Sequence, residues 1–114
     1  MARADNVYEL PTGLPVPQDD GACTHLTGMQ LPPVALRATD GSMVDLSVLP
    51  GWSIVYCYPR MGRPDQPSPT GWNEIPGARG CTPQTAGYRD HYQDILQLGI
   101  DAVFGVSTQD TAYQ

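Results

Sequence analysis

Residues 53–58 (Ser-Ile-Val-Tyr-Cys-Tyr) constrain the fold more than any other segment, because they carry no charge and are almost all β-branched or aromatic. A continuous apolar run of this length is typical of a strand buried on both faces, as in the centre of a parallel sheet. Residues 102–107 form a second such run, and residues 83–98 between them place apolar side chains at helical spacing. The pattern predicts a β–loop–α–β unit over residues 53–107, in which a right-handed crossover makes the strands parallel neighbours.

The expected helix has signals at both ends. Thr82 can cap its N-terminus, Pro83 suits the first helical position, and Gly99 can end it. Its apolar stripe contains four side chains: Tyr88, Tyr92, Ile95 and Leu96. The preceding loop, residues 59–80, holds five prolines and four glycines. A loop this long inside a compact domain is usually functional or mobile.

A β-hairpin is expected before this unit. Residues 34–39 and 42–46 flank Asp40-Gly41, a dipeptide that tolerates the positive φ angles of a two-residue hairpin turn. Residues 47–51 predict one short helical turn that Pro50-Gly51 ends. The fold class is therefore α/β, with a hairpin followed by β–α–β.

Few side chains are available to build a core. Leu, Ile, Val and Phe together make 22 of the 114 residues, whereas Gly and Pro make 24. We therefore expect a thin core. The proline-rich residues 1–33 predict an extended, weakly ordered arm, which leaves residues 34–114 as a partial domain. Since Ser107-Thr-Gln-Asp110 matches a capping box with little chain after it, we expect the N-terminal portion of a longer domain.

Charge and composition argue against several functional classes. The net charge is −6 and all six basic residues are arginines without a basic patch, which argues against a nucleic-acid partner. The longest apolar run is too short to span a membrane, and no signal peptide opens the sequence. Three widely spaced cysteines and two histidines supply neither a disulfide framework nor a zinc site. We expect a reduced, cytoplasmic chain without a metal.

Cys81 is the strongest candidate for chemistry, because it lies where the long loop meets the expected helix. Free backbone N–H groups and the helix dipole place partial positive charge at a helix start, which stabilises a thiolate. Arg79, two residues earlier, is expected to bring a positive charge near the thiol. The alternative is that Cys81 is a small buried filler, as free cysteines often are.

The other cysteines have weaker claims. Cys57 lies in the apolar run and is expected to pack inertly in the core. Cys23 lies in the arm beside His25 and is expected to be a mobile surface cysteine, although it could reach Cys81 as a resolving thiol. We expect His25 and His91 to be solvated, and Arg89 to form an outward ion pair or to pack.

Several short motifs occur in a defined order around Cys81. They are Asp40-Gly41 followed by Asp45-Leu46-Ser47, Val55-Tyr56-Cys57-Tyr58-Pro59, Pro76-Gly77-Ala78-Arg79-Gly80-Cys81-Thr82-Pro83-Gln84, Tyr88-Arg89-Asp90 and Val106-Ser107. In order and spacing, residues 34–114 resemble the first two-thirds of a peroxiredoxin, closest to the bacterioferritin-comigratory, or Q-type, branch of the family.

The resemblance implies a thioredoxin-like fold and a thiol-dependent peroxidase. Cys81 would be the peroxidatic cysteine, which attacks a hydrogen peroxide or alkyl hydroperoxide O–O bond and becomes a sulfenic acid. Thr82 and Arg79 would assist it, and Tyr58, Pro59 and Pro76 would line its pocket. The resemblance further implies thioredoxin or a similar dithiol as reductant, no metal or organic cofactor, and room for a homodimer.

The sequence departs from the family pattern at three places. Ala78 stands where the family carries a Thr or Ser hydroxyl, which Thr70, Thr82 or a backbone N–H would have to replace. Ala86 stands where many Q-type members place a resolving cysteine. The thiol that reacts with the sulfenic acid of Cys81 would therefore have to be Cys23, Cys57 or an external thiol. The family's catalytic arginine would lie beyond residue 114. The alternatives are therefore an inactive truncated or degenerate fragment, or a thiol redox sensor.

Overall fold

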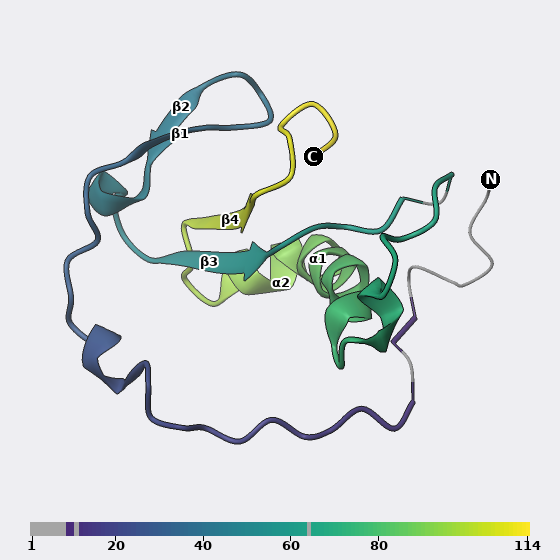
Figure 1. Ribbon diagram of the computed structural model, residues 1–114. Coiled ribbons are helices and arrows are strands. Elements are labelled where there is room, and N and C mark those ends of the chain that lie inside the picture. The colour runs from purple at the N-terminus through teal and green to yellow at the C-terminus, as the bar shows by residue number, and fades with distance from the viewer. Residues whose placement is uncertain (1–8, 11, 64) are drawn as a thin grey trace.

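A computed structural model describes residues 9–10, 12–63 and 65–114, so residues 1–8 and 11 of the expected arm lie outside it. Its strands and helices follow in the order β1 (Ala35–Arg37), β2 (Met43–Asp45), β3 (Ser53–Tyr58), α1 (Cys81–Asp90), α2 (Tyr92–Gln97) and β4 (Ala102–Ser107). Figure 1 shows these elements gathered at one side of a long N-terminal arm. The chain is a small mixed α/β protein with two two-stranded sheets.

The main sheet confirms the predicted pair of parallel strands. β3 and β4 have the predicted bounds, and their register runs from Ser53 opposite Ala102 to Tyr58 opposite Ser107. β3 is not buried on both faces as predicted: its exposure alternates, and Val55 and Cys57 are exposed. The reason is that only the face with Tyr56 packs on a helix, through the Tyr88 ring stacked at 4.2 Å.

The segment expected to form one helix contains two. The chain is helical from Cys81, one residue earlier than the expected cap at Thr82, and a 3₁₀ turn (Ala78–Gly80) precedes it directly. Cys81 therefore follows a helical turn rather than a free loop. His91 separates α1 from α2 with φ −102° and ψ 11°. Gly99, at φ +95°, ends the second helix as predicted, and its N–H donates to the Leu96 carbonyl.

The predicted hairpin is confirmed, but its turn is of a different type. β1 and β2 pair antiparallel with Arg37 opposite Met43. The Ala38 N–H donates to the Ser42 carbonyl, and the Gly41 N–H donates to the Ala38 carbonyl. These two bonds enclose a loop of three residues, 39–41. Only Gly41 in that loop has a positive φ, +87°. This is the type I turn followed by a left-handed glycine, the usual three-residue hairpin connection.

Two aspartates stabilise the turns at either end of β2. The Asp40 carboxylate accepts hydrogen bonds from the hydroxyl and N–H of Ser42, and Asp45 accepts the same pair from Ser47. The second arrangement caps a 3₁₀ turn at Leu46–Val48, close to the helical turn expected over residues 47–51. In each case the serine hydroxyl is the largest cause of a pKa below the ordinary 3.8 of the carboxyl group.

We expect Ser42→Ala to raise the pKa of Asp40 toward 3.8 and to leave Asp45 unchanged, because the lost hydroxyl serves Asp40 alone. Ser47→Ala is the reciprocal control. A lowered folded pKa stabilises the hairpin above pH 3.8, and this contribution is lost as the pH falls through the folded value. Carboxyl ¹³C chemical shifts, followed from pH 6 to pH 2, measure both groups. Equal shifts of both aspartates in either variant would contradict this assignment.

The predicted capping box after β4 is displaced by three residues. The Ser107 hydroxyl donates to the Pro59 carbonyl and accepts from the Gln109 N–H, so it ties two chain segments together. Asp110 caps instead: its carboxylate accepts the Tyr113 N–H, and its carbonyl accepts the Gln114 N–H. One helical turn thus begins at Asp110.

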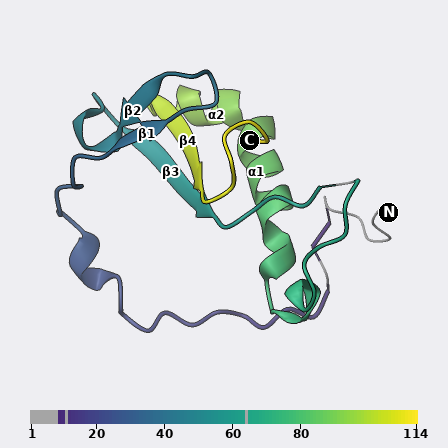
Figure 2. The ribbon, with the colours of Figure 1, turned by 45° about the horizontal axis from the view of Figure 1, so that its top comes forward.

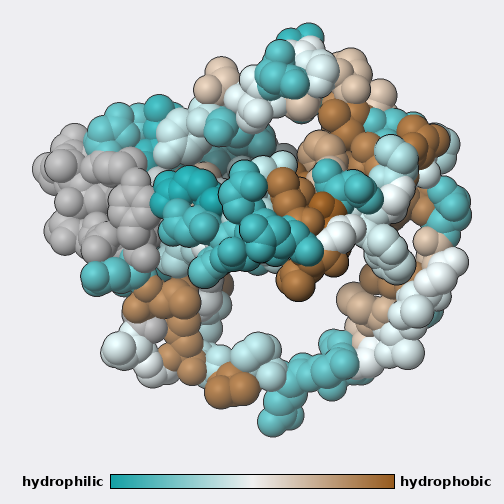
Figure 3. Space-filling view, turned by 180° about the vertical axis from the view of Figure 1, so that it is seen from behind, coloured by the Kyte–Doolittle hydropathy of each residue, from teal (hydrophilic) through white to brown (hydrophobic). Residues whose placement is uncertain are grey.

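The core is as thin as predicted. Among the described residues only Tyr58, Cys81 and Thr82 are buried, and no side chain is completely enclosed. The radius of gyration is 16.1 Å, against about 13 Å for a compact chain of this size. Figure 3 shows apolar residues in several separate surface patches. No helix in the described part of the chain is long and apolar enough to cross a membrane.

The arm runs as a wide loop in both Figure 1 and Figure 2. Its described residues are almost all exposed, and its one regular element is a 3₁₀ turn at Thr24–Leu26. Among its described residues, the Gln30 side-chain amide donates to the Ser47 carbonyl, and Leu10 lies against Gly80. The extended arm is therefore a surface feature that adds little to the core.

Candidate functional site

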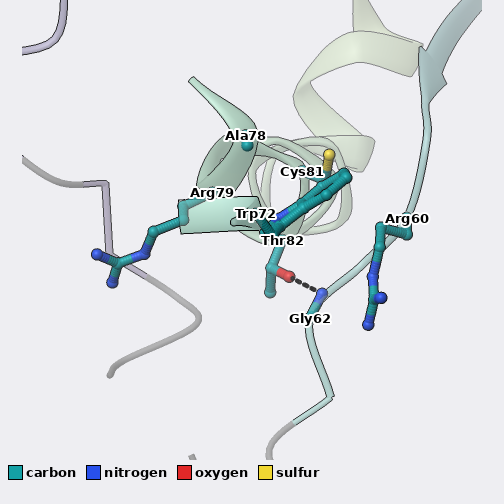
Figure 4. Close-up of a pocket in the computed structure, with 7 residues that line it drawn as sticks. All are labelled: Arg60, Gly62, Trp72, Ala78, Arg79, Cys81 and Thr82. Atoms are coloured by element: carbon teal, nitrogen blue, oxygen red, sulfur yellow. Dashed lines mark hydrogen bonds between the residues drawn. The ribbon is translucent and has the colours of Figure 1, made fainter. Parts of the chain in front are cut away.

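Cys81 lines a small hollow at the start of α1 (Figure 4). The hollow has a volume of about 10 Å³, roughly what one water molecule requires. Cys81 itself is 9% exposed. Seven residues from the β3–α1 loop and from the first turn of α1 form the wall: Arg60, Gly62, Trp72, Ala78, Arg79, Cys81 and Thr82.

Thr82 is the hydroxyl that the structure places beside Cys81. It is 4% exposed, and its Oγ1 accepts a hydrogen bond of 3.0 Å from the Gly62 N–H. The Thr82 oxygen therefore already accepts one hydrogen bond from the loop after β3. Thr70, the other candidate, is exposed and does not line the hollow. The hydrogen bond also ties the loop after β3 to the first turn of α1.

Arg60 and Trp72 belong to the site, although sequence reasoning assigned neither of them a role there. The Arg60 guanidinium carbon lies 5.7 Å from the centroid of the Trp72 ring, within cation–π range. Arg60 comes two residues after β3, and ligand sites in α/β proteins lie beyond the carboxyl ends of parallel strands. That position is the sequence signal that points to Arg60.

Arg79 occupies the wall of the hollow but does not approach the thiol as expected. Figure 4 shows its guanidinium directed away from Cys81, on the side opposite Arg60. The Cys81 sulfur points to a third side. The reason is local: Arg79 lies within the 3₁₀ turn that runs directly into α1, which sends the two side chains in different directions.

None of the three predicted pocket residues lines the hollow, although Tyr58 lies near enough to Cys81 for the two groups to interact electrostatically. Tyr58 is 7% exposed, and burial is the main cause that raises its pKa above the ordinary value, with the charges of Tyr56 and Cys81 adding to the rise. Pro59 and Pro76 are exposed and do not line the hollow. The Pro59 carbonyl instead accepts the hydroxyls of Ser107 and Thr108.

The other two cysteines are not brought to Cys81. All three cysteines are free thiols, and both Cys23 and Cys57 are exposed. The inert core packing expected for Cys57 is therefore wrong, because its side chain lies on the face of β3 opposite Tyr58. Cys23 begins the 3₁₀ turn of the arm, which both ribbon views place far from the start of α1. His25 and His91 are exposed as expected.

Arg89 has the outward role expected of it, since it pairs with Asp90 at 2.9 Å on an exposed surface. Among the described residues, no group of three or more His, Cys, Asp or Glu side chains could hold a metal ion. Comparison of the chain with protein-family models, with curated proteins and with solved structures found no match.

Proposed function

We propose that the chain is a thiol-dependent peroxidase of the peroxiredoxin type in which Cys81 attacks hydrogen peroxide. The observation that carries the proposal is the composition of one small hollow. It joins a thiol in the first turn of a helix to a buried hydroxyl, Thr82, and to the side chain of Arg60. In Figure 4 the Thr82 hydroxyl and the Arg60 guanidinium are directed away from the sulfur, so the reaction requires one of them to turn toward the leaving oxygen, where a donor stabilises the developing negative charge.

The proposed reaction conserves atoms and electrons. The Cys81 thiolate attacks one peroxide oxygen, the O–O bond breaks, and hydroxide leaves and takes a proton to become water. The sulfur is oxidised to a sulfenic acid while the peroxide is reduced. An external thiol then attacks the sulfenic acid, releasing water and forming a mixed disulfide, and a second thiol of a dithiol reductant restores Cys81. An external thiol is required because Cys23 and Cys57 lie elsewhere.

A thiol redox sensor is the second candidate function. It is favoured by the same hollow, whose volume of about 10 Å³ offers no preformed room for a peroxide and its donors together. It is also favoured by Ala78, which supplies no hydroxyl. A sensor needs only selective oxidation of Cys81, whereas a peroxidase needs a rate far above that of a free thiol.

We expect Cys81→Ser to abolish peroxide-dependent sulfenic acid formation, with Cys57→Ser and Cys23→Ser as matched controls that retain it. Dimedone labelling of the reduced chain, followed by peptide mass mapping, identifies the oxidised thiol. Stopped-flow peroxide consumption with a dithiol reductant then separates the functions. A rate at least a hundredfold above that of a free thiol supports the peroxidase, and a rate near it supports the sensor. Oxidation at Cys57 or Cys23 that outpaces Cys81 would contradict both.

A further inference from the structure

Trp72 forms the wall of the hollow that separates Cys81 from Arg60. The indole lies beside Cys81 in Figure 4, and the Arg60 side chain lies beyond it. Trp72 is half-buried, whereas Trp52, the other tryptophan, is 76% exposed. The volume left beside Cys81 is therefore set by where the Trp72 ring lies.

The segment that carries Trp72 is held by few bonds. It is a 3₁₀ turn of three residues, Trp72–Glu74, which follows Gly71 at φ +78° and precedes the extended Ile75. Its backbone hydrogen bonds are local: the Trp72 N–H donates to the Pro69 carbonyl, the Glu74 N–H to the Gly71 carbonyl, and the Ile75 N–H to the Trp72 carbonyl. The Ile75 carbonyl accepts the Ala78 N–H, so the segment is joined to the 3₁₀ turn before α1, and the Trp72 ring is carried by a short turn rather than by a helix or strand.

Arg60 comes from a better-anchored part of the chain. It directly follows β3 and Pro59, and the Pro59 carbonyl accepts two hydroxyls, one from Ser107 at the end of β4 and one from Thr108 after it. Two residues further on, the Gly62 N–H donates to the Thr82 hydroxyl in α1. The guanidinium near the Trp72 ring thus links the turn at Trp72–Glu74 to a segment attached to both β4 and α1.

We propose that Trp72, held by Arg60, is a specificity-determining residue that limits access to Cys81 by size. Hydrogen peroxide, with two heavy atoms, needs only a small displacement of the ring, whereas an alkyl hydroperoxide with a branched or aromatic group needs the turn to move away. The peroxide preference rests on the proposed function. The size limit itself applies to any reagent that reacts with the Cys81 thiol.

The test compares two thiol reagents of different size on the reduced chain. Iodoacetamide is small, and a fluorescein maleimide is bulky. We expect Trp72→Ala to raise the maleimide rate at Cys81 at least tenfold and the iodoacetamide rate by much less. Trp72→Phe should keep most of the restriction, because a ring remains. Arg60→Gln should change the maleimide rate in the same direction as Trp72→Ala but by a smaller factor.

Two controls keep the test specific. Trp52→Ala removes the exposed tryptophan and should leave both rates at Cys81 unchanged. The exposed Cys57, measured by mass mapping in the same samples, controls for the concentration and intrinsic reactivity of each reagent. An unchanged ratio of the two rates at Cys81 in Trp72→Ala, or an equal rise at Cys57, would overturn the proposal.

The outcome is independent of peroxidase activity, because alkylation requires only the thiol. If the chain does consume peroxide, Trp72→Ala should raise the rate with cumene hydroperoxide relative to hydrogen peroxide by a similar factor. If it consumes no peroxide but the alkylation ratio changes as expected, the proposed function fails and the size limit stands. If it consumes peroxide but the alkylation ratio is unchanged, the proposed function stands and the size limit fails.

Discussion

Gly51→Ala is expected to destabilise the chain by about 3 kcal/mol, the sum of a left-handed backbone strain and a lost charged hydrogen bond. Gly51 has φ +70°, and a Cβ placed there would overlap the Asp101 carboxylate. That carboxylate accepts the Trp52 N–H at 2.9 Å, and the Asp101 N–H donates to the Trp52 carbonyl at 2.8 Å. These bonds join the chain just before β3 to the chain just before β4.

Two further variants separate the causes. Gly99→Ala has the same kind of backbone strain, since Gly99 has φ +95° at the end of α2, but a Cβ there meets no atom within 4 Å and the change should cost only the strain. Asp101→Ala removes the overlap, so the cost of Gly51→Ala should be smaller in that background. Denaturant unfolding followed by circular dichroism measures the stability of the three single variants and of the double variant with Gly51→Ala and Asp101→Ala. Equal costs for Gly51→Ala and Gly99→Ala would show that the carboxylate is not in the way.

Gly105→Ala is expected to cost about 1–3 kcal/mol, the usual penalty of overpacking. Gly105 lies opposite Tyr56 in the register of β3 and β4, and a Cβ there would lie 2.7 Å from Cζ of the Tyr56 ring. The ring cannot move away freely because it stacks on Tyr88 with 9° between the planes.

The sign of this effect should reverse when the ring is absent. In a Tyr56→Ala background, Gly105→Ala should stabilise the chain by about 0.5–1 kcal/mol, because alanine loses less backbone entropy than glycine in a strand. A double-mutant cycle by denaturant unfolding measures the coupling. If Gly105→Ala costs the same in both backgrounds, Tyr56 is not the reason for the glycine.

The strands could be predicted from sequence because their signal is local. Residues 53–58 and 102–107 are uncharged and rich in β-branched and aromatic side chains; Pro59 directly follows the first run and Asp101 directly precedes the second. The burial of β3 is overestimated from sequence because a run of apolar residues does not indicate which elements pack on each face of the strand. The helix break at His91 was missed, since no proline or glycine marks it.

Part of the candidate site could also be predicted from sequence, because its signal is local. Cys81 and Thr82 are neighbours in sequence, and the change from a proline-rich loop to a helix locates them. Arg60 and Trp72 lie in a loop without periodicity, so their approach to Cys81 depends on how that loop folds back. The direction of Arg79 was also beyond prediction, because it follows from the 3₁₀ turn before α1.

Sequence alone thus determined the order and bounds of the parallel strands, the left-handed end of the second helix at Gly99, and the place of Cys81 at a loop–helix junction. Each of these depends on backbone preferences and periodicity within a few residues. Only the tertiary structure decided that Cys57 is exposed, that Asp101 meets Gly51, and that Arg60 and Trp72 stand beside Cys81. These contacts join residues distant along the chain, and their geometry depends on packing that no local pattern encodes.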